Sequence, residues 1–467
     1  MSILLINPPR KIAEGNIWKK IDRSLPPLGL AYIASYLEQQ GHKVSILDLQ
    51  AEELNSDEFK ERIKNINPAF AGITSTTVES EAALLIARLI KEINPMIMVI
   101  LGGVHPSIMP EEMLKDPAVD FVARGEGEYT LSELLTKGKD ISSISGLSYR
   151  FGQSFKHNPD RPFIESLDEM PLPAYHLLPM EKYRPSQGNY KRLPAASMIA
   201  TRGCPGRCTF CYTGVSGRKI RTRSAQNLVK EIKLLKAEYK IKEISFYDDT
   251  FTAFKENIAD FCRRITSEKI DITWSCMSRV DYVDARILAL MKKAGCHQIG
   301  YGIESASPEI LKNIKKTFPL ESAKEAVELT KKAGIDVRAM FMLGNPGETE
   351  ETLADTVDFA LSLKPDIAVF NITTPLPGTE MYEWAKSKGY LLDLGWDKFD
   401  LSHVVMHLPT VSDEKIIYYY RSGYRRFYFN PGYILKRLCK IRSFADIRNN
   451  MMTLFSLVSF QKEAKER

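Results

Sequence analysis

The sequence has few cysteines and no long apolar run. It holds seven cysteines in 467 residues, and none of them precedes Cys204. Because a membrane-crossing helix needs roughly 18 to 20 apolar residues in succession, the sequence predicts no such helix. The odd cysteine count, with most cysteines scattered without ligand spacing, also argues against a disulfide framework. We therefore expect a globular protein of a reducing compartment, the cytoplasm.

Basic residues are in excess only near the C-terminus. Residues 411–467 contain twelve Lys and Arg against five Asp and Glu, whereas the formal net charge of the whole chain is +6. The preceding residues therefore carry a net charge of about −1. A nucleic-acid-binding protein carries positive charge around its working surface, so this distribution disfavours nucleic acid as a partner.

Residues 1–140 alternate short apolar runs with amphipathic stretches. The runs that predict strands are 3–7, 43–48, 70–75, 96–101 and 120–123, and the stretches that predict helices are 28–40, 57–67, 79–94 and 128–137. Buried strands that alternate with helices predict a parallel sheet with helices on both faces. We expect an α/β, doubly wound, Rossmann-like (flavodoxin-like) domain whose ligand lies beyond the carboxyl ends of the strands.

The alternation stops at residues 141–190, where a proline-bearing stretch predicts a connector packed across domains. It resumes in residues 191–400, where six apolar runs are each followed by a helical pattern. These predicted strands are 195–201, 243–249, 271–277, 297–303, 337–343 and 366–372. Six such repeats predict a partial (β/α)6 barrel of the TIM type, with its chemistry at the C-terminal ends of the strands. Residues 401–467 predict a small, helical and basic C-terminal region.

Three cysteines cluster directly after the first strand of the predicted barrel. Cys204, Cys208 and Cys211 lie within TRGCPGRCTFCYTG and place three thiolates in one short loop. A four-iron four-sulfur cluster normally takes four cysteine ligands, so three leave one iron free for a substrate or cofactor. Structural zinc is the alternative, but zinc would need a fourth ligand nearby, and the sequence offers none.

Five motifs carry a resemblance to a known family: CxxxCxxC with Phe210 before its third cysteine, then FYDDTF, GYGIES, FMLGNPGET and TPLPGTEMY. With the N-terminal half, they resemble the radical S-adenosylmethionine (SAM) superfamily, and more narrowly its cobalamin-binding-domain subfamily, over roughly residues 1–400. The resemblance implies a 4Fe-4S cluster, SAM bound to its free iron, and cobalamin. It also implies that an electron from the cluster cleaves SAM to methionine and a 5′-deoxyadenosyl radical.

The SAM contacts that the resemblance implies are Phe210, Asp248, Asp249, Ser278, Arg279, Glu304, Gly344 and Leu376. The two aspartates would accept hydrogen bonds from the methionine amino group, and Arg279 would bind its carboxylate. Glu304 would bind the ribose hydroxyls, while the loops at Gly344 and Leu376 would contact the adenosyl group. The alternatives are a helix N-cap for the aspartates, a surface ion pair for Arg279, and ordinary turns for the two loops.

The cobalamin contacts that the resemblance implies are Asn7, Pro8, Thr76, Gly102, Gly103, His105, Ser107 and Glu126. Glycine at a strand end lets a flat, bulky ring lie against the backbone. The DxHxxG signature, by which other cobalamin domains supply an axial histidine, is missing from this sequence. His105 is therefore not assigned as a cobalt ligand, and a loop histidine bonded to backbone is its alternative.

The most common reaction of that subfamily is methylation of an unactivated carbon, in which a substrate radical takes the methyl group of methylcobalamin. Non-methylating oxidative cyclisation or rearrangement is the alternative on the same scaffold. Methylthiolation of tRNA is disfavoured, because those enzymes carry a further cysteine set in the N-terminal half. A different class, a zinc-stabilised nucleic-acid-binding protein, is the non-catalytic alternative.

The C-terminal region interleaves aromatic and basic residues over 416–444 and adds an apolar run at 451–460. This pattern predicts helices that pack on the barrel, and peripheral contact with the inner face of a membrane is the alternative. For partners, we expect a small-molecule or lipid-like substrate and an external electron donor of the flavodoxin or ferredoxin type.

Overall fold

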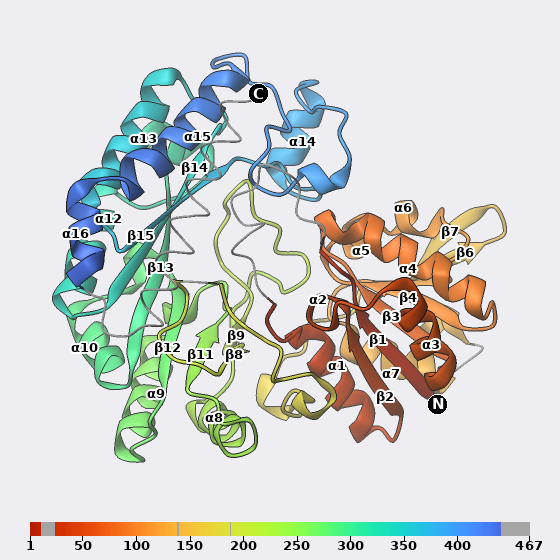
Figure 1. The fold of residues 1–467 in the computed structure, drawn as a ribbon. Coiled ribbons are helices and arrows are strands. Elements are labelled where there is room, and N and C mark those ends of the chain that lie inside the picture. Colours follow the sequence, from red (N-terminus) through yellow and green to blue (C-terminus); the bar gives the residue numbers. More distant parts are fainter. Residues whose placement is uncertain (11–23, 138–139, 187, 440–467) are drawn as a thin grey trace.

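The computed structural model describes residues 1–10, 24–137, 140–186 and 188–439, which form two α/β units lying side by side (Figure 1). The N-terminal unit contains a seven-stranded sheet and the second unit a six-stranded sheet. Within these residues, none of the helices combines the length and the apolar character that crossing a bilayer requires.

The N-terminal sheet has the strand order β2-β1-β3-β4-β5-β6-β7. Its parallel strands are β1 (Ser2–Asn7), β2 (Lys43–Asp48), β3 (Phe70–Thr74), β4 (Met98–Gly102) and β5 (Phe121–Ala123). Its helices are α1 (Leu28–Gln39), α2 (Leu49–Glu52), α3 (Ser56–Ile66), α4 (Ser80–Ile93), α5 (Val104–Ile108), α6 (Pro110–Leu114) and α7 (Gly127–Lys137). The order 2-1-3-4-5 is that of flavodoxin-like folds, so the predicted doubly wound domain is confirmed.

Strand β1 shows why helices cover both faces of this sheet. Ile3 and Leu5 belong to the core that contains α1 and α7, whereas Leu4 and Ile6 belong to the core that contains α3 and α4. All four side chains are at most 1% exposed. Since successive side chains of a strand point to opposite faces, an uninterrupted apolar run requires that both faces be covered.

Residues 141–190 are more regular than the sequence indicates. Strands β6 (Leu147–Phe151) and β7 (Ser154–His157) form an antiparallel hairpin that extends the N-terminal sheet beyond β5. No strand is predicted there from sequence, so the hairpin is a correction. The signal is weak because none of the residues of β7 is buried, which leaves no apolar alternation to detect.

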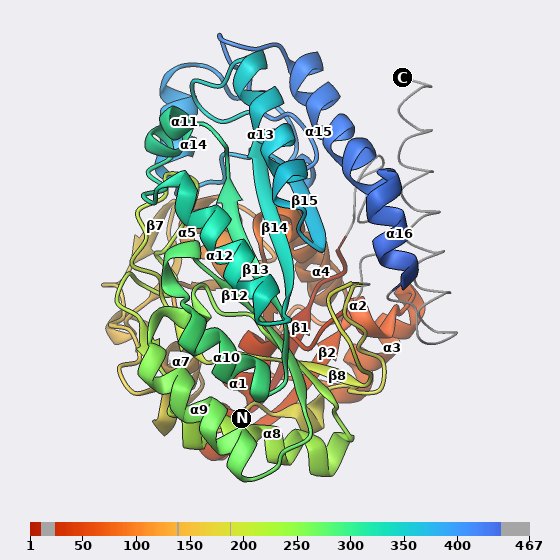
Figure 2. The same cartoon turned by 90° about the vertical axis from the view of Figure 1, so that its left-hand side faces the viewer.

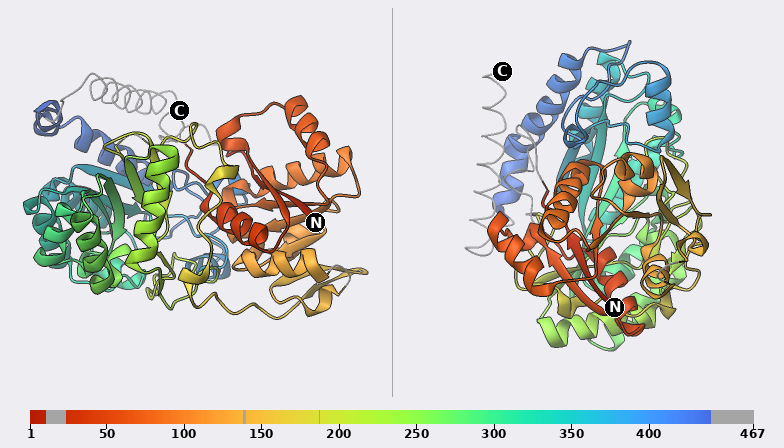
Figure 3. Two further views of the ribbon diagram at one scale, coloured as in Figure 1. Left: turned by 90° about the horizontal axis from the view of Figure 1, so that it is seen from below. Right: turned by 90° about the vertical axis from the view of Figure 1, so that its right-hand side faces the viewer.

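The second unit is an open barrel of six parallel strands in the order β15-β14-β13-β12-β11-β8. These strands are β8 (Ala195–Met198), β11 (Glu243–Phe246), β12 (Thr273–Ser278), β13 (Cys296–Glu304), β14 (Asp336–Leu343) and β15 (Ile367–Ile372). Its helices are α8 (Ala225–Tyr239), α9 (Lys255–Ser267), α10 (Ala285–Lys293), α11 (Pro308–Asn313), α12 (Leu320–Lys332) and α13 (Glu350–Leu363). The helices lie on the side of the curved sheet away from the N-terminal unit (Figure 3). The predicted partial barrel is thus confirmed.

Helices also follow the barrel: α14 (Glu380–Ser387), α15 (Asp413–Tyr428) and α16 (Pro431–Cys439). Helix α15 packs beside β15 (Figure 2), where the Tyr424 hydroxyl donates to the Phe370 carbonyl at 3.0 Å. The predicted helical C-terminal region is confirmed as far as α16. Residues 440–467, including the apolar run 451–460, lie outside the described residues.

Candidate functional site

The three predicted cluster ligands lie in the segment 203–220, here called the cysteine loop, between β9 (Thr201–Arg202) and β10 (Arg221–Thr222). Gly203 opens the loop with φ +98°, and a Cβ there would lie 2.4 Å from a backbone carbonyl oxygen, so only glycine fits. The amide of Thr209 donates to the Ile314 carbonyl at 3.0 Å, and the Thr209 carbonyl accepts from the Met381 amide at 2.8 Å. The cysteine loop is therefore packed against segments that follow β13 and β15.

The three thiols lie close together. Cys208 and Cys211 are hydrogen-bonded to each other, and a Cβ on Gly206 would lie 3.3 Å from the Cys204 Sγ and 3.9 Å from the Cys208 Sγ. Among the described residues, no three His, Cys, Asp or Glu side chains are arranged to hold a single metal ion. A cubane binds each cysteine through a different iron, so its thiols need to be near one another without meeting at one point. The arrangement fits a 4Fe-4S cluster better than zinc.

Charged side chains flank the thiols. The hydrogen bond from Cys211 lowers the pKa of Cys208 to about 6, and the ammonium group of Lys316 acts in the same direction. The Lys316 Nζ lies 3.0 Å from the Glu304 Oε1, with both side chains only 10% exposed. A cation beside a thiol favours the thiolate, which is the form that binds iron.

Glu304 and Lys316 meet because of the backbone at the end of β13. Glu304 has φ +70°, and the register between β13 and β14 shifts between Gly302 and Glu304. A Cβ on Gly302 would lie 2.4 Å from the Glu304 Oε1 and 3.2 Å from the Lys316 Nζ, so glycine leaves the space that this ion pair fills. Non-glycine residues in the left-handed region concentrate at functional sites, where surrounding structure supports the strain. Lys316 is missed from sequence because no motif marks it.

The two predicted aspartates hold the cysteine loop and the residues that lead into it. The Asp248 carboxylate accepts hydrogen bonds from the amides of Ala200 and Thr201, and Asp249 accepts from the Gly203 amide and from Ser216. Burial raises the pKa of Asp248 to about 7. Neither aspartate is the N-cap of α9, a position that Phe254 occupies. Their contact with SAM stays a prediction.

Arg279 adjoins the cysteine loop, because its Nη1 would lie 4.0 Å from a Cβ on Gly206. Its guanidinium group also forms a two-armed pair with Asp281, at 2.9 Å for each arm. Ser278 is buried, bonded to Thr252, and donates to the Arg279 carbonyl at 2.9 Å. Arg279 therefore lies beside the cysteine loop, and Ser278 supports it through the hydrogen bond to its carbonyl.

The remaining predicted SAM contacts are spread over three segments. A Cβ on Gly344 would lie 3.2 Å from Ile416 of α15. The Leu376 carbonyl accepts from the Thr379 hydroxyl at 2.6 Å, in the turn before α14. Phe210 is partly buried against the main core. The roles of these three residues toward SAM stay predictions.

A buried carboxyl group holds the loop after β14. Glu348 accepts hydrogen bonds from the amides of Gly344 and Asn345 through Oε2, while its Oε1 has no hydrogen-bond partner. Burial raises the pKa of Glu348 to about 8. The carboxyl group is therefore mostly protonated at neutral pH.

We expect Glu348→Gln to remove a pH-dependent loss of stability. Because the folded-state pKa of about 8 exceeds the ordinary 4.5, the stabilisation is complete below about pH 4.5 and is lost as the pH rises through 8. Melting temperatures of variant and parent should agree at low pH, and the variant should melt several degrees higher near pH 9. The control is Glu350→Gln, an exposed carboxylate paired with Lys415. The prediction would be contradicted if Glu350→Gln raised the melting temperature near pH 9 as much as Glu348→Gln does, or if Glu348→Gln did not raise it.

A pocket of about 310 Å³, here called the interdomain pocket, lies between the two units at the strand ends of the N-terminal sheet. Its lining from the N-terminal unit is rich in glycine and includes Gly29, Gly72, Gly102, Gly103, Gly125 and Gly127. Its lining from the barrel unit includes Thr201, Arg202, Val215, Ser216, Tyr247 and Asp249. Glycine allows a flat ring to contact the backbone directly, and the barrel residues place the cysteine loop at the opposite wall.

Some of the predicted cobalamin contacts belong to the interdomain pocket. Gly102, Gly103 and Glu126 line it. Ser107 supports it from behind, since its hydroxyl donates to the Gly103 carbonyl at 2.6 Å and accepts from the Gly125 amide at 3.0 Å. The contacts of these residues with cobalamin stay predictions.

Like Ser107, the other four predicted cobalamin contacts are not among the lining residues: Asn7, Pro8, Thr76 and His105. The Asn7 amide donates to Asp48 at 2.8 Å, and the Thr76 hydroxyl donates to Glu79 at 2.7 Å. Pro8 is buried.

His105 is fully buried, with its Nε2 3.7 Å from Glu112 and its ring packed edge-on against Trp396 at 5.3 Å. The ring is thus held by side chains rather than by the backbone, and His105 is not among the residues that line the interdomain pocket. Among the described residues that line this pocket there is no His, Cys or Met, the usual nitrogen and sulfur ligands of a metal.

The residues present fit three cofactors. The thiols fit an iron–sulfur cluster, the Glu304–Lys316 pair beside them offers a carboxylate and an ammonium group to a zwitterion, and the glycine-rich pocket fits a flat ring. A cysteine loop at the mouth of a partial barrel, facing a doubly wound domain, defines a class of iron–sulfur enzymes that use a second, ring-shaped cofactor.

Comparison with known proteins agrees with this division. The family model of the radical SAM superfamily matches residues 198–360, and that of the B12 binding domain matches residues 17–135. An uncharacterized methyltransferase of Pyrococcus horikoshii is 38% identical over 449 residues, which are 95% of this chain and 96% of that protein. The anaerobic magnesium-protoporphyrin IX monomethyl ester cyclase of Rubrivivax gelatinosus is 29% identical over 88% of this chain and 75% of that protein.

Among solved structures, the cobalamin-dependent SAM radical enzyme OxsB, with aqua-cobalamin and SAM bound, shares the fold with a TM-score of 0.78. The likeness covers 100% of this chain and 71% of that one at 19% identity. The chain belongs to the radical SAM superfamily, in the subfamily with an N-terminal cobalamin-binding domain. It is an enzyme whose cofactors are a 4Fe-4S cluster, SAM and cobalamin. The alternative of a non-catalytic, zinc-stabilised nucleic-acid-binding protein is wrong.

Proposed function

We propose that this enzyme methylates an unactivated carbon of a small-molecule or lipid-like substrate. The observation that carries the proposal is that residues of the cysteine loop also line the interdomain pocket. Val215 and Ser216 of the cysteine loop line the interdomain pocket, and so does Asp249, which accepts from the Gly203 amide of that loop. The two cofactor sites therefore adjoin, as transfer between a radical and a methyl donor requires. The methyltransferase name of the relative at 38% identity supports the proposal.

When bound, the cluster with SAM supplies the radical that removes a hydrogen atom, and cobalamin supplies the methyl group. The residues of the chain hold these groups in place. Cys204, Cys208 and Cys211 hold the cluster through their thiolates. Lys316, together with the predicted Arg279, would bind the carboxylate of SAM, and Glu304 would bind its ribose hydroxyls, because each offers the complementary charge or acceptor.

Transfer of an isotopic label tests the reaction type. The anaerobically reconstituted enzyme is incubated with a reductant, an extract of small molecules from its host, and SAM that carries a labelled methyl group. Methylation predicts label in a small-molecule product or on the corrinoid. Label recovered wholly in methionine, while 5′-deoxyadenosine forms, would overturn the proposal.

The second candidate is a non-methylating oxidative cyclisation. The specific observation in its favour is the likeness to the cyclase of Rubrivivax gelatinosus, which extends over 88% of this chain. The same experiment separates the two candidates, since a cyclisation leaves the methyl group in methionine.

The proposal includes two further partners. The chain carries one CxxxCxxC loop, so the reducing electron would come from an external donor of the flavodoxin or ferredoxin type. Helix α16 exposes Ile434, Leu435 and Leu438 by 40%, 64% and 57% beside Lys436 and Arg437. Apolar and basic side chains on one short helix support a peripheral contact with the inner, anionic face of a membrane, for an enzyme that works in the cytoplasm.

A further inference from the structure

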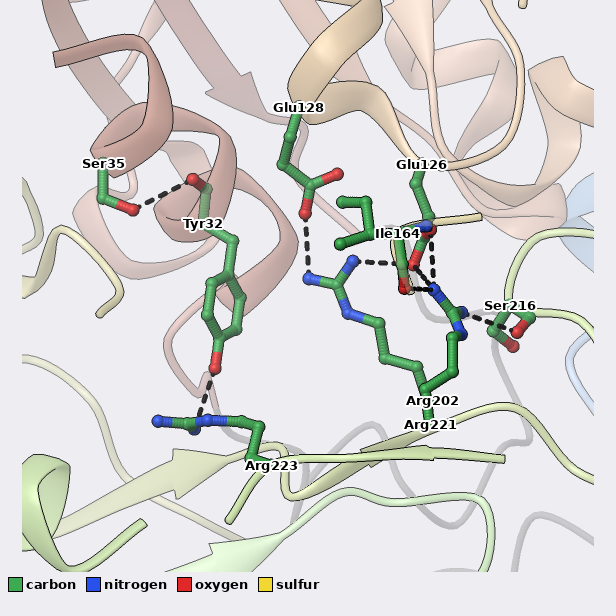
Figure 4. Close-up of polar contacts among 9 residues, drawn as sticks. All are labelled: Tyr32, Ser35, Glu126, Glu128, Ile164, Arg202, Ser216, Arg221 and Arg223. Atoms are coloured by element: carbon green, nitrogen blue, oxygen red, sulfur yellow. Dashed lines mark hydrogen bonds and ion pairs between the residues drawn. The ribbon is translucent and has the colours of Figure 1, made fainter. Parts of the chain in front are cut away.

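Buried ion pairs join the two units at the wall of the interdomain pocket (Figure 4). Glu126 and Glu128 come from the N-terminal unit, where β5 leads into α7, and Arg202 comes from β9 of the barrel unit. The Arg202 Nη1 lies 2.8 Å from the Glu126 Oε1, and its Nη2 lies 2.8 Å from the Glu128 Oε1. One guanidinium group thus bridges two carboxylates of the other unit.

Arg221 completes this network from β10. Its Nη1 lies 2.9 Å from both carboxylate oxygens of Glu126 and donates to the Ile164 carbonyl at 2.7 Å. Its Nη2 donates to the Ser216 carbonyl at 2.8 Å, within the cysteine loop. The network therefore holds the end of the cysteine loop as well as its beginning.

The four charges depend on one another. Their side chains are between 3% and 14% exposed. Arg202 and Arg221 are paired directly across the β9–β10 ladder, where two like charges would repel. Glu126 and Glu128 offset this repulsion, because their negative charges lie against the two guanidinium groups. Removing one partner of a buried ion pair leaves a charge without compensation, so the geometry is strongly enforced.

The same ion pairs also connect the wall of the interdomain pocket with the start of the cysteine loop. Arg202 stands two residues before Cys204, and Glu126, Glu128 and Arg202 all line the interdomain pocket. A carboxylate of the pocket wall is thus bonded to the residue from which the cysteine loop starts. A relative shift of the two units by more than the tolerance of a hydrogen bond would break both arms of Arg202.

We propose that Arg202 is a positioning residue: by holding Glu126 and Glu128 at once, it sets the distance between the cluster and the cobalamin bound in the interdomain pocket. The inference rests on the proposed function, for which that distance matters. Arginine can hold two carboxylates in a fixed fork, whereas lysine offers a single ammonium group without fixed geometry.

Two conservative variants test the role. Arg202→Lys keeps the charge and Glu128→Gln keeps the shape, so the fold can persist while one arm is lost or weakened. In the anaerobic holoenzyme, the relaxation of the Co(II) EPR signal by the reduced cluster should slow in both variants. The dissociation constant of cobalamin should rise about tenfold, while iron content and SAM affinity stay unchanged. The double variant should be no worse than the poorer single one, because both changes remove the same contact.

Lys219→Gln is the matched control, since Lys219 lies in the same loop and its pair with Glu165 is exposed by 75% and 74%. It should alter neither the EPR relaxation nor the cobalamin affinity. If the unaltered enzyme bound no cobalamin, the proposed function would fail. If it bound cobalamin and both variants matched it, the positioning role alone would be overturned. Should Arg202→Lys not fold, Glu128→Gln decides, because glutamine keeps the shape of the side chain and replaces the charge-assisted bond to Arg202 by a weaker neutral one.

Discussion

Replacing Cys208 by alanine should abolish the brown chromophore of the anaerobically reconstituted enzyme and reduce SAM cleavage roughly a thousandfold. The hydrogen bond between Cys208 and Cys211 lowers the pKa of Cys208 and raises that of Cys211, so Cys208 is the thiol of this pair that ionises first. A cluster held by Cys204, Cys208 and Cys211 would keep only two protein ligands after the loss of Cys208. Iron and acid-labile sulfide should fall from about four per chain to below one. Formation of 5′-deoxyadenosine, followed by chromatography, measures the cleavage.

Cys262→Ala is the control for this variant. Cys262 lies on α9, and burial raises the pKa of its thiol, so it lacks both the spacing and the thiolate character of a ligand. The change creates a small cavity and lowers stability slightly, but the full iron content should remain. A Cys208→Ala enzyme that kept its four irons would show that the cluster is held elsewhere.

The fold could be predicted because its signal is local. The buried strands, such as the run from Ile3 to Ile6, are continuously apolar, and this pattern reports a sheet covered on both faces. The hairpin β6–β7 could not be predicted, because β7 has no buried residue and lies at the edge of the sheet. Alternation of apolar and polar residues arises from burial of one face, so a strand without buried residues does not show it.

In the candidate site, too, some residue roles could be predicted from the sequence and others could not. The cysteine spacing identifies the cluster ligands, since a short loop must place its thiols near one another. The roles of Asp248 and Asp249 depend on what lies opposite them: the structure places the amides of Ala200 and Thr201 at Asp248, and the amide of Gly203, which opens the cysteine loop, at Asp249. His105 is held by Glu112 and Trp396, which lies 291 positions later in the chain. Contacts between remote segments have no counterpart in a motif.

The position of Lys316 near the thiols depends on the fold and could not be predicted from a sequence motif. It follows Glu304 by 12 residues and Cys208 by 108, yet its ammonium group is paired with Glu304 and lies near enough to Cys208 to lower the pKa of that thiol. Burial by itself would lower the pKa of Lys316, but Glu304 and Cys208 outweigh this and raise it. The group therefore remains a cation beside the thiols. A fixed cation beside the thiols would suit the carboxylate of SAM.

We expect Lys316→Met to weaken SAM binding by roughly 10- to 100-fold and to leave the cluster in place. Methionine retains the length of the side chain and removes the charge, so the SAM carboxylate loses a charge-assisted hydrogen bond of about 1.5–3 kcal/mol. The SAM concentration needed to change the EPR spectrum of the reduced cluster measures the affinity, and the iron content checks the cluster. Lys315→Met is the control, because Lys315 is 49% exposed and paired with Glu380. Equal SAM affinity in the two variants would show that Lys316 serves only to neutralise Glu304. The SAM carboxylate would then be left to Arg279, whose Nη1 would lie 4.0 Å from a Cβ on Gly206.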